Sequence, residues 1–281
     1  MNKKWTRILI AAIVFLIVCI GVVSYLFNSK LNKEVKTVKN FLQVLYDNNM
    51  VETKVKIDDI DFQISKHSDG GKKYYRVTSK MYGFDLDTDY NVIAFNNYYD
   101  VTTINGVSIT ENESLLLAEK YIAEIVSDDY KYKERIVDGN DTLSYYGYIF
   151  TKYKDGYPYY SDQIMIQIDK YSGYLTAYTN SSTQNEPEKA NVNIKIDGAE
   201  AIAIEAFNNS SNKEGIINND SVYIAYCDNS EKTLTKLCYV VVVKGLDINN
   251  KDVKWKYFIT TDTGELLNSI KDTVSETSVE H

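Results

Sequence analysis

Two kinds of hydrophobic pattern alternate along the chain. Apolar residues recur at three- and four-residue steps in 31–49, 110–125 and 198–209, which is the spacing of one face of an α-helix. Short runs in which apolar and polar residues alternate follow each of these segments, and such alternation predicts half-buried β-strands. The sequence therefore predicts three helices, each followed by three or four antiparallel strands.

Two of the predicted helices begin with capping signals. Thr110 is followed three residues later by Glu113, the spacing of a capping box, in which each side chain bonds the other residue's backbone N–H. Asp197 precedes the third helical pattern and has the acceptor side chain of an N-cap. We expect these helices to start directly after Thr110 and Asp197.

Each predicted group of strands closes in the same way. An apolar strand end leads into a polar turn, then Asn91, Gly173 or Gly264, and then a short apolar strand. Asn and Gly tolerate positive φ, so we expect each of them to hold a left-handed position in a hairpin. A similar helix-to-turn spacing indicates one unit that occurs three times. The predicted fold class is α+β, with tandem units of one helix packed on a small antiparallel sheet.

The N-terminus carries the signals of a membrane anchor. Three basic residues lie within 1–7, and 8–27 is an uncharged, apolar run. Such a run spans roughly 30 Å as a helix, the thickness of a hydrocarbon core. The run has no clear cleavage site, and Cys19 is preceded by Val18 rather than by the small residue of a lipoprotein signal. We expect an uncleaved transmembrane signal anchor with a cytoplasmic N-terminus and an extracytoplasmic C-terminal domain.

These patterns give a predicted division of the chain. Its parts are a cytoplasmic tail at 1–7, the anchor at 8–27, a divergent first α+β unit at 31–104, a second unit at 105–190, a third unit at 191–270 and a disordered tail at 271–281.

Composition and charge argue against several classes of function. The net charge is −8, whereas a duplex nucleic-acid binder normally shows a basic footprint, so we expect no nucleic-acid partner. Only 2 His and 3 Cys are present, which argues against a His-rich metal site or a four-cysteine zinc site. No nucleotide-binding or hydrolase motif occurs, so we expect no cofactor and no catalytic residue. Abundant Lys, Asn, Ile and Tyr suggest a low-GC Gram-positive bacterium.

The carboxylates offer candidate chemistry. Asp85, Asp87 and Asp89 alternate, so on a strand they would point to one face. Three such side chains are candidate Ca²⁺ ligands, although the Gly and distal Glu of an EF-hand loop are missing. The alternatives are a solvated strand face and a pair of carboxylates that act as acid and base in a hydrolase.

Tyrosine and cysteine supply the remaining candidates. The chain has 25 Tyr, and Tyr covers half-wet sheets as readily as it forms binding hot spots. Cys227 and Cys238 flank a polar loop between two strand-like runs, so a disulfide or a pair of reduced, half-buried thiols is expected there. The candidate aromatic binding surface comprises Tyr145, Tyr146, Tyr148, Tyr157, Tyr159 and Tyr160.

The second and third units resemble PepSY domains, which start with a helix rich in Ala and acidic residues and end with a strand, an Asp-containing turn with Gly, and another strand. In the second unit, 112–123 resembles that helix and 168–175 resembles the final strand, turn and strand. In the third unit, 198–203 and 261–266 match the same two features about as well. The first unit departs from the pattern because Asn91 stands in place of Gly. A more distant resemblance is to the accessory ectodomains of envelope sensor kinases.

The resemblance implies a non-catalytic, membrane-tethered extracytoplasmic module that binds and regulates an envelope protein. PepSY domains are associated with restraint of secreted peptidases, so the expected partner is a peptidase or a signalling protein of the envelope. A carboxylate-dependent cell-envelope hydrolase and a glycan-binding envelope module are the alternatives that the residues leave open.

Overall fold

The fold is described from a computed structural model of the chain, which describes residues 33–98, 108–137, 143–182, 185–187, 189–210 and 212–272. The chain divides into two compact units. The first unit consists of Met1–Val126, Val137–Gly147 and Ile166–Thr179, and the second of Ser127–Ile136, Tyr148–Met165 and Asn180–His281.

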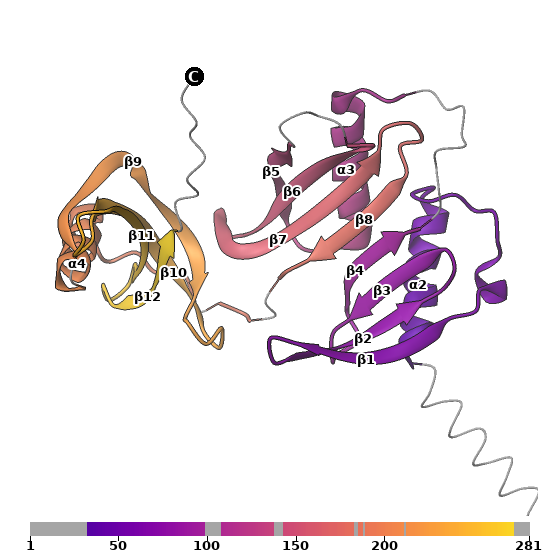
Figure 1. Ribbon diagram of the computed structural model, residues 1–281, viewed down its shortest axis with the longest axis horizontal. Helices are drawn as coiled ribbons and strands as arrows, with labels where there is room; N and C mark the ends of the chain where they lie inside the picture. Colours follow the sequence, from indigo (N-terminus) through magenta and orange to yellow (C-terminus); the bar gives the residue numbers. More distant parts are fainter. Residues whose placement is uncertain are drawn as a thin grey trace, which may run out of the picture. The chain divides into compact units, whose positions relative to one another are not determined.

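Helices and strands follow the order that the hydrophobic pattern predicts, and Figure 1 labels them along the chain. The helices are α2 (Lys33–Asp47), the short 3₁₀ helix η1 (Ile57–Asp59), α3 (Glu111–Ile125) and α4 (Ile196–Asn209). The first strands are β1 (Gln63–Asp69), β2 (Lys72–Thr78), β3 (Tyr82–Leu86) and β4 (Val92–Asn97). The middle strands are β5 (Tyr130–Ile136), β6 (Tyr145–Lys154), β7 (Tyr157–Asp169) and β8 (Leu175–Asn180). The last strands are β9 (Lys213–Asp228), β10 (Thr235–Leu246), β11 (Asp252–Thr260) and β12 (Leu266–Asp272).

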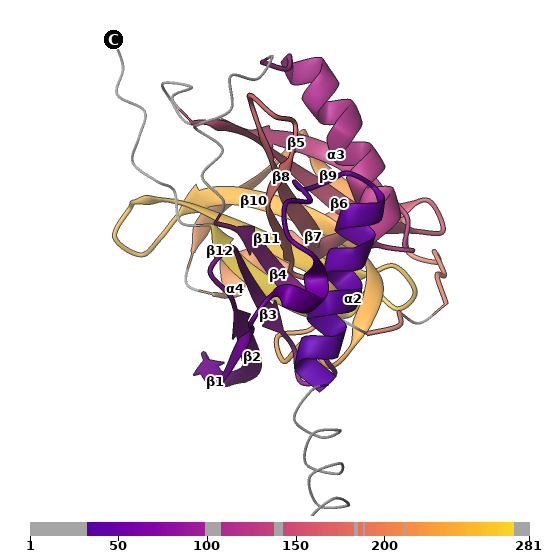
Figure 2. The same ribbon diagram turned by 90° about the vertical axis from the view of Figure 1, so that its right-hand side faces the viewer.

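In the first unit, α2 packs on the antiparallel strands β2 to β4. Val38, Leu42 and Leu45 lie on one face of the helix and are fully buried, as the three- and four-residue spacing of apolar positions predicts. Phe41 adds its ring to those of Phe84, Phe95 and Tyr178, with ring centroids about 6 Å apart. Figure 2 shows α2 lying across β3 and β4. This part of the first unit's core therefore lies between α2 and one face of the sheet.

The helix α3 starts where the sequence predicts. The Thr110 side chain accepts a hydrogen bond from the backbone N–H of Glu113, and the Glu113 carboxylate accepts one from the backbone N–H of Thr110. The predicted capping box is thereby confirmed. These hydrogen bonds to the charged carboxylate lower the pKa of Glu113.

In the second unit, α4 packs on β9, β10 and β11. Ala199, Ala203 and Phe207 are fully buried against an apolar patch of the strands that includes Val241 and Ile259. The small side chains bring the helix close to the sheet, and the Phe207 ring fills the space that remains at its C-terminal end. The helix starts at Ile196 after an N-cap at Lys195, so the predicted N-cap Asp197 is wrong and this residue lies in the first turn.

The fold class predicted from the sequence is also wrong, because the strands do not form separate small antiparallel sheets. They join a single 12-stranded sheet in the order β1-β2-β3-β4-β8-β7-β9-β10-β11-β12, to which β6 and then β5 are added beside β7. The sheet is mixed, since Tyr159 of β7 is aligned with Tyr226 of β9 in parallel. Strands β7 and β9 are long, with 13 and 16 residues.

Several parts of the predicted division lie outside the described residues. These include the tail 1–7 and the anchor 8–27. Within the part of the chain that the structure describes, no helix is both long and apolar enough to cross a bilayer. Strand β12 ends at Asp272, so the first two residues of the predicted tail 271–281 belong to a strand, and 273–281 lie outside the described residues.

Candidate functional site

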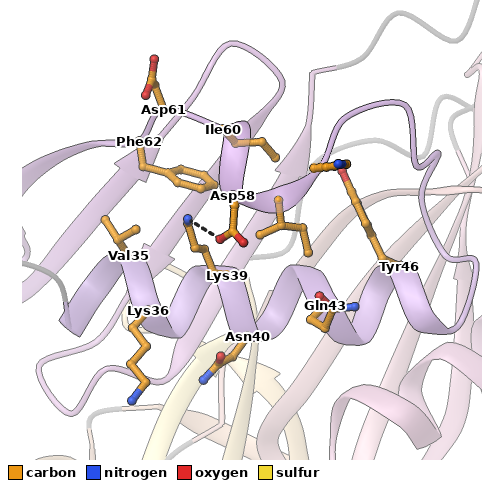
Figure 3. Close-up of a pocket in the computed structure, with 12 residues that line it drawn as sticks. Val35, Lys36, Lys39, Asn40, Gln43, Tyr46, Asp58, Ile60, Asp61 and Phe62 are labelled. Atoms are coloured by element: carbon orange, nitrogen blue, oxygen red, sulfur yellow. Dashed lines mark hydrogen bonds and ion pairs between the residues drawn. The ribbon is translucent and has the colours of Figure 1, made fainter.

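A groove in the first unit runs between α2 and the segment 56–62, which contains η1. Its volume is about 930 Å³, and we call it the α2–η1 groove. Figure 3 shows the helix on one side and the η1 segment on the other, with side chains of both reaching into the space between them. The lining residues are Val35, Lys36, Lys39, Asn40, Gln43 and Tyr46 from α2, and Lys56, Ile57, Asp58, Ile60, Asp61 and Phe62 from the segment.

The sequence builds the two walls by different means. The amphipathic pattern of α2 buries Val38 and Leu42 in the core and leaves Asn40 and Gln43 on the exposed face that lines the groove. The η1 segment is held by its own apolar residues. Ile60 is 8% exposed, and the Phe62 ring meets the ring of the core residue Phe84 edge-on at 6.3 Å.

Charges of both signs lie on the rim. Lys39 Nζ lies 3.0 Å from a carboxylate oxygen of Asp58 and so joins the two walls. The Asp58 side chain is 93% exposed, so this ion pair contributes less than about 1 kcal/mol to stability and exchanges readily for a pair with a ligand. The other charged lining residues are Lys36, Lys56 and Asp61.

One end of the groove is fixed by a pair of tyrosines. The hydroxyl of Tyr46 lies 3.2 Å from that of Tyr82. Burial of Tyr82, together with this hydrogen bond, raises its pKa well above the ordinary value for tyrosine. The Tyr82 hydroxyl therefore stays protonated at neutral pH, and the Tyr46 ring forms the end wall of the groove. An apolar floor with polar and charged edges suits a short amphipathic peptide segment.

The candidate Ca²⁺ ligands serve the protein's own structure. Both carboxylate oxygens of Asp85 accept hydrogen bonds from Arg76, at 2.8 and 2.9 Å. Asp87 accepts hydrogen bonds from the backbone N–H groups of Asp89 and Asn91, and so shapes its own turn. Among the residues that the structure describes, no group of three His, Cys, Asp or Glu side chains is placed to hold a metal ion.

The candidate tyrosine surface is divided. Tyr148 and Tyr159 are only 1% and 4% exposed, so their rings are part of the protein interior. The four others, Tyr145, Tyr146, Tyr157 and Tyr160, are half-buried. Tyr145 and Tyr146 belong to the first unit and the other four to the second, so the six do not make up a patch within either unit.

Two of the three predicted turn residues have positive φ. Gly173 and Gly264 both have a φ of 75°. Asn91 is not among the residues with positive φ, and in that turn the preceding residue, Tyr90, has a φ of 71°. The first turn therefore places its left-handed residue one position earlier than the sequence suggests.

Cys227 and Cys238 are free, buried thiols in the structure. In the β9–β10 ladder Cys227 is opposite Lys236 and Cys238 is opposite Ala225, so the two cysteines are diagonal neighbours. Burial raises the pKa of the Cys227 thiol well above its usual value. The disulfide considered from the sequence stays a prediction.

Sequence reasoning did not identify the α2–η1 groove. The only signal for it was the run of Asp58, Asp59 and Asp61 next to hydrophobic residues, shortly after a helix with a lysine-rich exposed face. Such a run is also typical of a solvated turn, and the contact between this segment and α2 decides between the two interpretations.

Comparisons with known proteins add little to this description. The chain matches no protein-family model and no curated protein. Among solved structures it is similar to the Bacillus megaterium YpeB C-terminal domain, with 16% sequence identity and a TM-score of 0.44. The match covers 83% of this chain and 96% of that chain. We draw no conclusion about function from a likeness at this level.

Proposed function

We propose that this protein is a non-catalytic, membrane-tethered extracytoplasmic binding protein that holds a short segment of another envelope protein in the α2–η1 groove. Through this contact it restrains its partner, which is a peptidase or a signalling protein. The observation that carries the proposal is the groove itself, with its apolar floor and its ion-paired rim. The resemblance of the second and third units to PepSY domains favours the same kind of function.

The chemistry of the groove favours a peptide. Ile60 and Phe62 supply apolar surface, and burial of apolar ligand surface is the main source of affinity in such sites. Asn40 offers an amide donor and acceptor to a peptide backbone, and Gln43, whose Nε2 donates to Asp47 at 2.7 Å, offers its amide oxygen as an acceptor. The Lys39–Asp58 pair presents one charge of each sign, which selects a segment with complementary charges and fixes its direction.

The position of the groove in the sequence favours a partner at the membrane. Helix α2 begins at Lys33, only a few residues after the predicted anchor 8–27 ends. A linker this short keeps the groove near the bilayer surface. We therefore propose that the bound segment is the membrane-proximal part of another anchored protein.

Site-specific photocrosslinking in living cells tests this function. A benzoylphenylalanine at Gln43 lies in the groove, whereas one at Val44 lies on the exposed surface of the same helix and outside the groove. We expect the Gln43 position, and not Val44, to give an adduct with one envelope protein, which mass spectrometry of the adduct identifies.

The identified partner segment is then synthesised and titrated against the purified full-length chain. Val35→Glu removes apolar surface from the groove and places a carboxylate one helical turn from Lys39, where it competes with Asp58, so it should weaken binding by about tenfold or more. Val44→Glu adds the same charge outside the groove and should bind like the wild type. Adducts formed only with lipid or with a second copy of the chain, or equal affinity of the two variants, would refute the proposal.

A further inference from the structure

The second unit contains another groove, which is lined mainly by tyrosines and lysines. Its volume is about 620 Å³, and we call it the tyrosine–lysine groove. Strands β5, β6, β7, β9 and β11 all contribute to it. Its principal residues are Lys131, Tyr132, Tyr153, Tyr160, Tyr223 and Lys256.

The aromatic rings in the groove are held in place but remain accessible. Tyr132 and Tyr223 are 42% and 45% exposed, so a ligand can reach both rings. Tyr132 packs edge-on against the buried Phe150 ring at 6.1 Å, and Tyr160 packs in the same way against Phe258 at 4.8 Å. These contacts fix the rings, so a ligand that stacks on them does not have to order them first.

The groove is positively charged although the chain is acidic overall. Lys131, Lys133 and Lys256 line it, and among the described lining residues there is no Asp or Glu. The ammonium groups are held over the floor, since Lys131 Nζ lies 4.4 Å from the centre of the Tyr153 ring.

These lysines do have carboxylate neighbours outside the groove. The ammonium-to-carboxylate distances are 3.6 Å for Lys131 with Asp129, 3.4 Å for Lys133 with Glu134 and 3.5 Å for Lys256 with Asp272. Pairs of this kind are weak, contributing about 0–1 kcal/mol, so the lysines remain available to an anionic ligand.

A buried hydroxyl lies beside the charged rim. Thr151 is 5% exposed and lines the groove, and its Oγ1 has no hydrogen-bond partner among the atoms that the structure describes. A ligand hydroxyl that reaches Thr151 would supply the hydrogen-bond partner that this side chain lacks within the protein. Ser161 and Gln163 add further polar groups to the lining.

We propose that the tyrosine–lysine groove binds an anionic oligosaccharide. Exposed phenol rings suit the apolar face of a sugar ring, and side-chain hydroxyl and amide groups suit its hydroxyl groups. The lysines supply the complement to carboxylates on the sugar. This combination favours a saccharide over an acidic peptide. An acidic peptide would pair with the lysines but would leave the exposed tyrosine rings without a matching surface.

Isothermal titration of the full-length chain in lipid nanodiscs, which contain no sugar detergent, tests the proposal. The probe is α-1,4-linked trigalacturonate. Its comparison ligands are α-1,4-linked galactotriose, which lacks the carboxylates, and the peptide triglutamate, which has side-chain carboxylates but no sugar rings. We expect each comparison ligand to bind about tenfold more weakly than trigalacturonate, because each lacks one of the two matched features.

Matched variants locate the site. Lys256→Gln should weaken trigalacturonate binding about tenfold, which is typical for the loss of a charge-assisted hydrogen bond. Lys254 lies on the same strand and also pairs with Asp272, at 2.8 Å, but it does not line the groove, so Lys254→Gln should bind like the wild type. Tyr223→Leu keeps apolar area but removes the flat ring, and should also weaken binding about tenfold.

Thr151→Val separates a binding role from a structural one. Because Val has the same shape and lacks the hydroxyl, we expect weaker binding together with an unfolding midpoint that is unchanged or higher.

Equal losses of binding in Lys254→Gln and Lys256→Gln would show general charge attraction and overturn the proposal. Triglutamate binding as tight as that of trigalacturonate would show a site for acidic peptides, and a failure of trigalacturonate to bind would also overturn the proposal. None of these outcomes depends on the α2–η1 groove.

Discussion

A substitution of Gly264 tests how the turn before β12 is held against α4. Gly264 has a φ of 75°, and its N–H donates to the Thr260 carbonyl oxygen at 3.0 Å. A Cβ added at this position would lie 3.2 Å from Cδ1 of Ile202 on α4, and 3.6 Å from the Ile194 side chain. Any side chain here therefore meets both an unfavourable backbone conformation and a crowded neighbour.

Gly173 has the same arrangement in the first unit. Its φ is also 75°, and its N–H donates to the Asp169 carbonyl oxygen at 3.1 Å. A Cβ would lie 3.1 Å from Cδ1 of Leu117 on α3. In addition, the Tyr121 hydroxyl donates a hydrogen bond to the Gly173 carbonyl oxygen at 3.1 Å, which ties the turn to the helix. We expect the two glycines to respond alike to substitution.

The expected cost has two parts. A left-handed backbone costs a side chain with a Cβ about 1–2 kcal/mol, and a β-branched side chain more. Crowding against the helix adds about 1–3 kcal/mol, as for other overpacked positions. Gly264→Val and Gly173→Val should thus lower the free energy of unfolding by about 2–5 kcal/mol. The Asn variants avoid most of the backbone cost but keep the crowding of the Cβ, so they should lose about 1–3 kcal/mol.

Gly156 provides a matched control. Its φ is 84°, and an added Cβ would have nothing within 4 Å. Gly156→Val therefore measures the backbone cost alone, and its difference from Gly264→Val gives the contact with α4. Urea unfolding of each variant at unchanged m-value gives these free energies. If Gly264→Val costs no more than Gly156→Val, the turn does not contact the helix. If Val is as mild as Asn at Gly173 and Gly264, the turns are not left-handed.

Three other predictions concern the rest of the chain. Protease added to intact protoplasts should digest the chain after the anchor 8–27. A soluble protein whose N-terminus lies near the end of this anchor would instead show that the anchor is a cleaved signal peptide. The buried thiols of Cys227 and Cys238 should resist iodoacetamide until the chain is unfolded, and a linked peptide pair in protein from the native envelope would instead support the disulfide. Burial raises the pKa of Tyr121 to about 12, so its contribution to stability is complete below the unfolded value near pH 10 and is lost as the pH rises to about 12. Tyr121→Phe should accordingly show a smaller loss of stability over this range in pH-dependent unfolding, and an equal loss would contradict the assignment.

The sequence predicts local structure well where a single short-range contact determines it. Thr110 and Glu113 form the expected capping box because both partners lie within one helical turn. The same logic was wrong at Asp197, where the apolar Ile196 already belongs to the helix. An Asp within the first turn is also favourable, because it lies near the unpaired N–H groups at the start of the helix. The presence of an Asp therefore does not show at which residue the helix begins.

Long-range pairing was not predictable in this way. Alternation identified most of the strands, but nothing in the sequence around Tyr159 or Tyr226 indicates that β7 and β9 are aligned in parallel. Which strands become neighbours depends on the edges that remain unpaired after the hairpins have formed, and that is a property of the whole sheet. The α2–η1 groove has the same origin, because it exists only where the segment 56–62 lies along the helix.

The first turn shows why residue type alone misplaced a left-handed position. The carbonyl oxygen of Asp87 accepts from Tyr90, and its side chain accepts from the backbone N–H of Asn91 at 2.8 Å. The turn after Asp247 has the same two hydrogen bonds, with positive φ at the third residue after the Asp, here Asn250. In both turns the Asp side chain holds the loop closed, as in other Asx turns, and this sets which residue is left-handed. A tyrosine is therefore found at positive φ in the first turn although the next residue, Asn91, would tolerate it better. The first turn therefore has the same form as the turn after Asp247. It differs from the turns at Gly173 and Gly264, where the left-handed glycine donates its N–H to the carbonyl oxygen four residues earlier.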